Sequence, residues 1–531
     1  HKEFEKNLWE EHKGKIYLCL GLQSFTFNPS NKTIIFNDGG SGDFSTLWKR
    51  VIDNAAAGKH TKFKKLICED FNTFFDPDGN WERGDKFQLC AVTGEEGIKN
   101  QTLVNLNPRA ETEEDKVWVL KSVKEQAELG NSLKDADYIL TYLGKDYQGS
   151  SFLEKRAAYN MGVANSGIFH YLFDEEQLSF DEAEFRKISS ADVARVRGIN
   201  LPEFYHYARL KGTRCSYGYL FYGGNKQAKV GKENKTFEQL CMVESKNSET
   251  FLGILRMDVD GLGLIFADGI PVEKRSFAAY STLSAQLDWF FSGYLNTIRN
   301  SELFKDHVNI IYSGGDDVFA IGRWDKIILF AEKIRSEFRR FTGREDISIS
   351  GGIAIVNAKF PIRLGASMAG DAETKAKRFN NGQKNALCIF GEVIGWENEW
   401  PEVKALKDEL IRLITLDGGL SKAFLHQLIR WKVQKDEGKN ISFRWHTAYY
   451  LKKYSRNYEK NPSILEFLEK IRIALFTGQG QFSSNKIKHT ALRYYDLAAV
   501  AGRWTETVSY THLRAHETVL DLVCRLLLEK K

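Results

Sequence analysis

The most constraining feature of this sequence is a run of small and acidic residues, Ser313-Gly314-Gly315-Asp316-Asp317, set between two apolar segments. Those segments are rich in β-branched and aromatic residues, a pattern typical of short buried strands joined by a tight turn. The two glycines let the backbone take conformations that other residues resist, and they let a phosphate come close. Adjacent carboxylates repel each other and become tolerable where a divalent cation neutralises them. The competing interpretation is an ordinary surface turn, because Gly and Asp are common turn residues.

A second acidic segment favours the cation interpretation. Residues 252–263 are an apolar strand candidate that ends in carboxylates and glycines, with the acids Asp258 and Asp260. Apolar residues then recur at helical spacing over 276–298, and beyond the hairpin the pattern predicts a helix at about 326–341 and a strand at 347–356. Strand, helix, hairpin, helix, strand is the order of a split βαβ fold, whose first strand lies beside the hairpin. The sequence therefore predicts an α+β, ferredoxin-like fold that brings Asp258 towards the hairpin acids.

The palm domain of polymerases and nucleotide cyclases has this order and these acids. The surrounding residues resemble one branch of it, the large subunit (Csm type) of type III CRISPR effector complexes. Four segments carry the resemblance: Leu255-Arg256-Met257-Asp258-Val259-Asp260-Gly261-Leu262-Gly263, Leu283-Ser284 followed by Trp289 to Leu295, Ile311 to Asp317, and Ser350-Gly351-Gly352-Ile353. Four such segments in the right order, over about 100 residues, are a specific signal.

A palm of this kind joins nucleotides by attack of a ribose hydroxyl on an α-phosphate, with loss of pyrophosphate, at two divalent ions. We expect Asp258, Asp316 and Asp317 to be catalytic and to bind two Mg²⁺ or Mn²⁺ ions, and we rank Asp260 second as a ligand. Cations of the segment 369–385 suit a triphosphate, although a solvated helix face is the alternative. The expected nucleotide-binding residues are Gly314, Gly315, Lys375, Lys377, which matches a recurring lysine of the family, and Ser284, which resembles a family position.

The resemblance implies the substrate and the biological role. It implies that ATP is joined into cyclic oligoadenylate, for antiviral defence, when target RNA pairs with guide RNA in a complex with small and backbone CRISPR subunits, in a prokaryotic cytoplasm. Two alternatives stay open. A diguanylate-cyclase-like enzyme would use GTP, although it expects Gly-Gly-Asp-Glu-Phe where this chain has Gly-Gly-Asp-Asp-Val. A scaffold subunit of an RNA-guided complex would use the palm only for packing.

Composition sets wider limits. A length of 531 residues suggests three or four domains. The net charge of +5 permits contact with RNA without demanding it. Seven cysteines with no Cys-x-x-Cys pair indicate free thiols in a reducing cytoplasm. No apolar run is long enough to cross a membrane and no signal peptide is recognisable, so we expect no membrane partner.

The expected domains follow the changes in pattern along the chain. Residues 1–66 resemble the remainder of a first palm, with a strand at 15–22 and a helix at 44–57, and 67–245 form a middle domain with a strand and turn at 217–225. Residues 246–395 are the catalytic palm, and 396–507 a helical domain with five amphipathic segments. Residues 508–531 resemble translated adapter read-through, so this probable non-native tail, with His512 and His516, is excluded.

Two family features are missing from the sequence. The chain starts at His1 and shows no His-Asp metal pair, so we expect an N-terminally truncated protein without the HD nuclease, whose isolated chain turns ATP over poorly. Cys90 stands where the family often begins a zinc ribbon, but Thr93 replaces the second cysteine. Because a structural zinc site needs four ligands, we predict that this loop folds without zinc.

Overall fold

The computed structural model describes residues 17, 19–30, 33–69, 71, 87–107, 110, 112–113, 116–143, 159–163, 168–174, 194–200, 215–224, 226–231, 233–242, 251–437, 442–476, 481–482 and 489–509. The chain forms two units, one of residues 1–220 and 261–285 and one of residues 221–260 and 286–531. The predicted tail lies beyond the described residues except for its first two positions, and so do His512 and His516.

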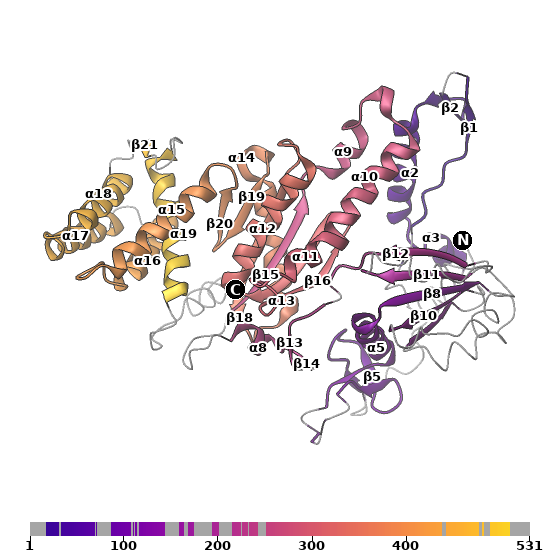
Figure 1. The fold of residues 1–531 in the computed structure, drawn as a ribbon, viewed down its shortest axis with the longest axis horizontal. Coiled ribbons are helices and arrows are strands. Elements are labelled where there is room, and N and C mark those ends of the chain that lie inside the picture. The colour runs from indigo at the N-terminus through magenta and orange to yellow at the C-terminus, as the bar shows by residue number, and fades with distance from the viewer. Residues whose placement is uncertain are drawn as a thin grey trace. The chain divides into compact units, whose positions relative to one another are not determined.

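The acidic segments lie in a six-stranded sheet of order β16-β17-β15-β18-β19-β20 (Figure 1). Its strands are β15 (Phe251–Val259), β16 (Val308–Gly314), β17 (Asp317–Arg323), β18 (Ile349–Asn357), β19 (Ala386–Ile389) and β20 (Glu392–Gly395). The first strand, β15, pairs antiparallel with β17 of the hairpin and with β18. This is the predicted split βαβ order, so the ferredoxin-like fold is confirmed.

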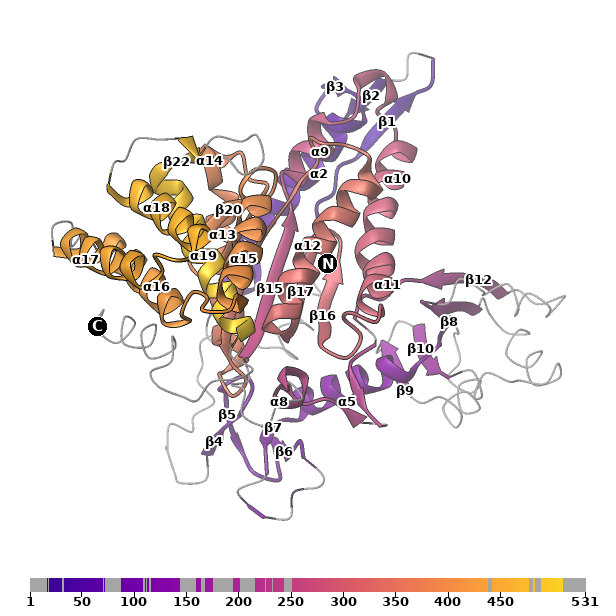
Figure 2. The same ribbon diagram turned by 60° about the vertical axis from the view of Figure 1, so that its left-hand side comes forward.

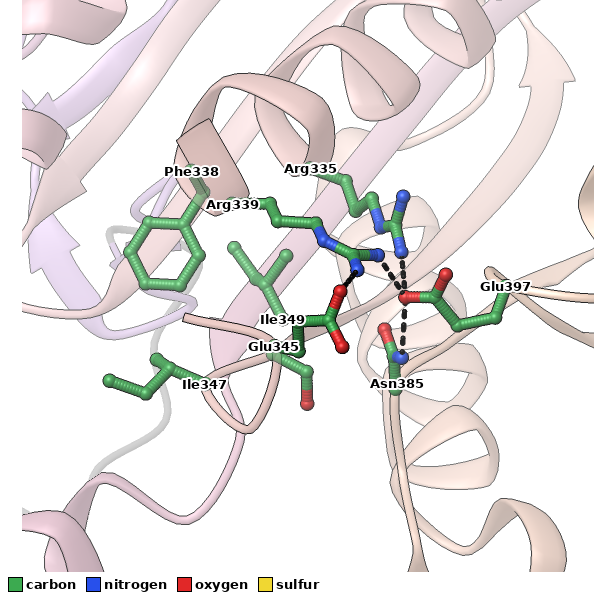
Figure 3. A pocket seen from close by; sticks show the side chains of 9 residues that line it. Arg335, Phe338, Arg339, Glu345, Ile347, Ile349, Asn385 and Glu397 are labelled. Carbon is green, nitrogen blue, oxygen red and sulfur yellow. Dashed lines mark hydrogen bonds and ion pairs between the residues drawn. The ribbon is translucent and has the colours of Figure 1, made fainter. Parts of the chain in front are cut away.

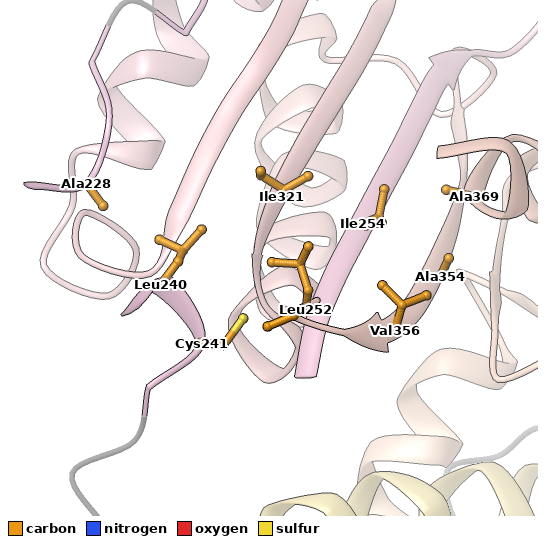
Figure 4. Close-up of a cluster of buried hydrophobic side chains, with 10 residues drawn as sticks. Ala228, Leu240, Cys241, Leu252, Ile254, Ile321, Ala354, Val356 and Ala369 are labelled. Atoms are coloured by element: carbon orange, nitrogen blue, oxygen red, sulfur yellow. The ribbon is translucent and has the colours of Figure 1, made fainter. Parts of the chain in front are cut away.

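Helices cover both faces of this sheet. Strand alternation puts Gly253 against α12 (Trp324–Thr342), where a Cβ on the glycine would lie 2.9 Å from Ile327. The next residue, Ile254, points the other way and meets Gly365 of α13 (Ile362–Lys377). An apolar cluster fills the space on the Ile254 side (Figure 4). It includes Leu252, Ile254, Ile321, Ala354, Val356 and Ala369, together with Leu240 and Cys241 of α8 (Phe237–Cys241).

The helix predicted at 276–298 is confirmed, but with an interruption. It consists of α10 (Phe277–Asp288), a π-helical segment η4 (Trp289–Tyr294) and α11 (Leu295–Arg299). The neighbouring rings of Phe290 and Phe291 are both fully buried. A π turn is wider than an α turn and is frequent at functional sites. Here the hydroxyl of Ser313 in the hairpin donates to the carbonyl of Phe291 at 2.6 Å, so η4 supports β16.

The turn of the strand and turn predicted at 217–225 lines β16. Strand β12 (Cys215–Leu220) ends in the first unit, and in the second unit a turn follows with Gly223 and Gly224. A Cβ on Gly223 would lie 2.5 Å from the Ser313 carbonyl oxygen, so only glycine fits there. The Ala228 amide then donates to the Asn309 side chain at 2.7 Å. The predicted strand and turn are confirmed, and their structural role is to cover this edge. Short strands β13 (Lys229–Val230) and β14 (Glu233–Asn234) follow.

The C-terminal part of the second unit is helical, as predicted. Its helices are α15 (Glu399–Thr415), α16 (Ala423–Asp436), α17 (Ser442–Asn457), α18 (Pro462–Phe476) and α19 (Ala491–Ser509), with α14 (Phe379–Gly382) before them and short strands β21 (Gln481–Phe482) and β22 (His489–Thr490). Figure 2 shows them on the side of the sheet where β20 lies. Among the described residues no helix is long and apolar enough to cross a membrane.

In the first unit, α2 (Phe44–Lys59) packs on α9 (Leu262–Asp268) beside the strands β1 (Phe25–Asn28), β2 (Thr33–Phe36) and β3 (Ser41–Gly42) and the turn η3 (Val272–Lys274). The predicted strand at 15–22 is wrong over its described part, since residues 17 and 19–22 pair with no strand. The reason is packing. Gly21 lies so close to α2 that a Cβ would meet the Val51 carbonyl oxygen, which leaves this stretch against a helix rather than beside a strand.

The remaining described part of the first unit is a sheet of order β12-β11-β8-β10-β9 and a small lobe around Cys90. The elements are α3 (Lys64–Glu69), β4 (Phe87–Leu89), β5 (Glu96–Ile98), β6 (Leu103–Asn105), β7 (Trp118–Leu120), α5 (Lys121–Asp135), β8 (Tyr138–Leu143), β9 (Tyr159–Val163), β10 (Ile168–Phe173) and β11 (Ala194–Ile199). The Cys90 sulfur is buried and accepts the amides of Thr93 and Leu120, both at 3.4 Å. The loop is therefore held by apolar packing and backbone hydrogen bonds to one thiol.

Candidate active site

The sheet brings the separated acids together. Asp258, the penultimate residue of β15, is the direct cross-strand neighbour of Asp317, the first residue of β17. Asp316 precedes Asp317 in the hairpin turn. All three side chains are half-buried. The predicted convergence of Asp258 on the hairpin is therefore confirmed as geometry, and it places three carboxylates at one end of two adjacent strands.

The hairpin turn is open above these acids. Gly315 has φ +65°, and no atom lies within 4 Å of the position a Cβ would take. Left-handed backbone of this kind favours glycine. Gly314 has no such constraint, because its Cβ would find its nearest neighbour, the Tyr312 hydroxyl, at 3.6 Å, an ordinary contact. Gly315 is thus required for the turn itself, while Gly314 keeps the approach to the acids uncrowded.

The carboxylates perturb one another strongly. Burial, a hydrogen bond to Asp258 and repulsion from Asp258, Asp316 and Glu373 raise the pKa of Asp317 to about 6. Burial and the charge of Asp258 also raise the pKa of Asp316. Raised carboxyl pKa values mean that ionising all the acids together is unfavourable without a compensating cation. The cluster of Asp258, Asp316 and Asp317 therefore needs additional positive charge to be fully ionised.

One lysine supplies part of that charge. The Lys377 ammonium, on the last turn of α13, pairs with Asp258 and lies 2.8 Å from Glu373 one turn earlier. Burial opposes the charge of Lys377, but the hydrogen bonds to Asp258 and Glu373 raise its pKa overall. Glu373 is only 7% exposed and also faces Arg256, at 3.4 Å. The cluster is therefore a chain of alternating charge that runs from Arg256 through Glu373 and Lys377 to Asp258.

Asp260 ranks second among the expected metal ligands, but its carboxylate makes other contacts. Strand β15 ends at Val259, and the carboxylate of Asp260 turns to the neighbouring chain segments. One oxygen, Oδ2, accepts the hydroxyls of Ser348 and Ser350 at 2.7 and 2.9 Å. The same oxygen accepts the Asn385 amide at 3.0 Å. Asp260 thereby connects the end of β15 with the starts of β18 and β19. None of these three hydrogen bonds involves Asp258, Asp316 or Asp317.

One expected nucleotide contact, Lys375, is not brought to the acids, and the position of a second, Ser284, relative to them is not described. Lys375 is exposed and, two residues from Lys377, lies on the other side of α13, because two residues turn a helix by about 200°. Its charge acts on the Cys388 thiol instead. Ser284 is an exposed residue of α10 in the part of that helix that belongs to the first unit, so its place relative to the acids is not described.

A shallow pocket lies next to the segments that Asp260 joins by hydrogen bonds (Figure 3). Its lining includes Arg335 and Arg339 of α12, which both pair with Glu397; the Arg339 bond is 2.6 Å. Arg339 also pairs with Glu345 at 2.6 Å. The Asn385 side chain donates to Glu397 at 3.4 Å. Both arginines are thus neutralised by carboxylates, and the cluster braces the β18–β19 region rather than offering an anion site.

The donor set of the acid cluster fits a hard divalent cation, which prefers carboxylate oxygens. Among the described residues no group of three or more His, Cys, Asp or Glu is arranged so that it could hold a metal ion. At this site the carboxylate of Asp258 is already paired with Lys377. Asp258, Asp316 and Asp317 would hold such a cation once Lys377 turns away.

Sequence reasoning missed Glu373, which holds Lys377, and the serines that hold Asp260. The first could have been found, because residues four apart on a helix face each other and an acid there commonly pairs with a lysine. The second could not, because Ser348 and Asp260 are 88 positions apart and only the sheet register joins them.

Comparison with known proteins places these residues in a family. Residues 251–388 match the family described as Cas10/Cmr2, second palm domain. A Cas10/Csm1 (subtype III-A) single-strand-specific deoxyribonuclease of Enterococcus italicus is 36% identical over 218 residues, 40% of this chain and 27% of that protein. Its counterpart in Methanocaldococcus jannaschii is 25% identical over 461 residues, 78% of this chain and 53% of that protein. The chain thus spans about half or less of these curated relatives.

The fold agrees with solved structures. The Csm1–Csm4 cassette without ligand matches with a TM-score of 0.53 at 16% identity, over 84% of this chain and 53% of the matched one. The same cassette in complex with cA4 matches with a TM-score of 0.50 at 16% identity, over 95% and 59%. At such identity the likeness concerns the fold. The sequence matches show that residues 251–388 resemble the second palm domain of Cas10/Cmr2 proteins and that the chain is similar to Cas10/Csm1 proteins of subtype III-A.

Proposed function

We propose that this chain carries the catalytic palm of a metal-dependent nucleotidyltransferase that joins ATP into cyclic oligoadenylate within an RNA-guided antiviral complex. The observation that carries the proposal is the placement of Asp258 beside Asp316 and Asp317 with Lys377 in contact. The substrate class and the partners rest on the relatives, since the Csm1–Csm4 cassette has been solved with AMPPNP and with cA4. The proposal is confined to the palm, where the matching residues lie.

In the proposed reaction, a ribose hydroxyl oxygen of one nucleotide bonds to the α-phosphorus of a second. The bond between that phosphorus and the pyrophosphate oxygen breaks, and the hydroxyl proton passes to water. Two divalent cations held by Asp258, Asp316 and Asp317 would supply the charge that activates the attacking oxygen and stabilises the leaving one. Lys377 would turn from Asp258 to the phosphates, and the open turn at Gly315 would admit them.

Glu373 gives this exchange a physical basis. It is buried between Arg256 and Lys377, and it precedes the lysine by one turn of the same helix. When a cation takes over Asp258, Lys377 loses one carboxylate partner and keeps the other. The lysine thus remains charged and close to the site, where it can bind a phosphate oxygen.

The test compares Asp316→Ala/Asp317→Ala with the unchanged chain. Binding of Mn²⁺ is followed by electron paramagnetic resonance, binding of ATP by fluorescence of a labelled analogue, and turnover by chromatography of the products in the chain assembled with its partner subunits. We expect the double variant to lose Mn²⁺ binding, metal-dependent ATP binding and turnover. Competition between ATP and GTP separates the proposal from a GTP-using cyclase, because only ATP should displace the analogue well.

Asp408→Ala/Glu409→Ala is the matched control, because it also removes two adjacent acids but from α15, outside the palm site. It should bind Mn²⁺ and ATP as the unchanged chain does. If Asp316→Ala/Asp317→Ala keeps full metal binding and turnover, the site assignment is wrong and the palm serves only as packing.

A further inference from the structure

A second surface outside the palm combines exposed aromatic rings with positive charge. It lies on α17 (Ser442–Asn457), whose sequence SFRWHTAYYLKKYSRN contains no acidic residue. Trp445 is 75% exposed and Tyr449 is 66% exposed, although rings of this size are usually covered. Lys452, Lys453 and Arg456 are also exposed.

These five side chains share one face of the helix. At 100° per residue, positions 445, 449, 452, 453 and 456 fall within an arc of about 100°. The opposite side of α17 carries Thr447 and Leu451, which are buried, and Tyr454, whose ring contacts Phe424 of α16 at 5.2 Å. Packing of α17 on α16 and α18 thus uses one side of the helix and leaves the aromatic and basic side free.

The positive charge of this face is not compensated nearby. Among the described residues, no carboxylate pairs with Lys452, Lys453 or Arg456. On the neighbouring helix α18, Glu466 pairs with Lys470 and Glu469 with Arg472, so these acids are already engaged within their own helix. An anionic partner would therefore meet three free cations.

We propose that this face of α17 binds a single-stranded nucleic acid. Unpaired bases stack on exposed aromatic rings whatever their sequence, and the phosphates between them bind cations placed alongside. From residue 445 to residue 456 the helix rises about 16 Å, enough to follow a few nucleotides. A duplex hides its bases from the rings, and an acidic protein would use the cations but would not need two exposed rings in line with them. The surface is separate from the carboxylate site and does not depend on nucleotidyl transfer.

The experiment measures fluorescence anisotropy of labelled 12-mer RNA, DNA of the same sequence, and the RNA duplex, with the full chain over a range of salt concentrations. Trp445→Ala/Tyr449→Ala should weaken single-strand binding at least about tenfold, since each stacked base contributes about 1–3 kcal/mol. Lys452→Glu/Lys453→Glu should reduce the slope of log K against log salt by about 1.4, because each phosphate contact contributes about 0.7 for single strands.

Lys274→Glu/Lys359→Glu is the matched control, because it makes the same charge change at two exposed lysines elsewhere. It should keep the salt slope and the affinity of the unchanged chain. Circular dichroism should show the α17 variants and the control folded, since their changed side chains are exposed. Asp316→Ala/Asp317→Ala should also keep the affinity, which makes failure here distinguishable from failure of the palm proposal.

Three outcomes overturn the inference. The unchanged chain could fail to bind either single strand at low salt, the duplex could bind better than the strands, or the α17 variants could bind as the control does. Binding of a poly-glutamate peptide without binding of any oligonucleotide would assign the face to an acidic protein instead. Preference for RNA over DNA, or the reverse, would identify the strand while supporting the proposal.

Discussion

Replacing Asp260 tests whether this residue stabilises the junction of β15, β18 and β19 or binds a metal ion. Asp260→Ala removes the single oxygen that accepts the Ser348 and Ser350 hydroxyls and the Asn385 amide. A hydrogen bond to a charged group contributes about 1.5–3 kcal/mol, and bonds that share one acceptor do not add fully. We therefore expect the junction of β15, β18 and β19 to lose about 3–5 kcal/mol of stability.

Asp260→Asn is the matched variant. Its amide oxygen can take the place of Oδ2 and keep all three hydrogen bonds without the charge. Its amide nitrogen would then replace Oδ1, which is buried and has no hydrogen-bond partner. Loss of charge assistance and burial of an unsatisfied N–H should together cost about 1–2 kcal/mol.

Hydrogen–deuterium exchange reads this effect locally, which matters because a chain of several domains does not unfold in two states. A loss of about 3 kcal/mol speeds exchange by about 100-fold or more where opening is local, since 1.4 kcal/mol is tenfold. Asp260→Ala should show this in peptides that contain residues 348–350 and Asn385, while Asp260→Asn shows a smaller effect and keeps Mn²⁺ affinity. If Asp260→Asn abolishes Mn²⁺ binding while exchange stays unchanged in both variants, Asp260 is a metal ligand, and the proposed stabilising role at the strand junction is wrong.

Three further predictions concern the acid cluster. Lys377→Met should tighten Mn²⁺ binding severalfold, because a competing cation leaves Asp258, and should weaken ATP binding about tenfold by loss of a charge-assisted hydrogen bond; titrations of each ligand show both. Because the pKa of Asp317 is about 6, Mn²⁺ affinity should fall about tenfold per pH unit below 6 and level off above 7, as calorimetry over pH 5–8 can show. Gly315→Ala should destabilise the palm by about 1 kcal/mol through its positive φ, and Gly314→Ala by less, as hydrogen–deuterium exchange of the hairpin peptides can compare.

Each of these has a result that would contradict it. Equal effects of Lys377→Met and Lys375→Met would mean that contact with Asp258 is irrelevant. A flat pH profile would mean that no proton competes with the cation. Equal exchange rates in Gly314→Ala and Gly315→Ala would contradict the argument that Gly315 is needed for the turn.

In the metal-free protein the raised pKa of Asp317 makes stability fall with rising pH, whereas the affinity for Mn²⁺ rises. The carboxyl ionises first in the unfolded chain, so the stability that this group contributes is lost as the pH rises from about 4 to about 6.

The sequence alone predicted those features that depend on residues close together in the chain. The hairpin at Gly314-Gly315, the helices of the C-terminal domain and the order of the palm strands all follow from periodicity and turn residues, which act between near neighbours. The same reasoning was wrong for residues 17 and 19–22, which pair with no strand because the backbone at Gly21 lies directly against α2. The domain boundaries remain a prediction.

The roles of individual acids were decided by tertiary structure. Asp258 and Asp260 lie two positions apart in one motif and look alike as ligands, yet one meets Asp317 and the other meets Ser348, Ser350 and Asn385. That difference comes from the register of β15 with its neighbours and from the end of the strand at Val259. A carboxylate takes its function from the charges and donors around it, and those arrive from segments that the local sequence does not contain.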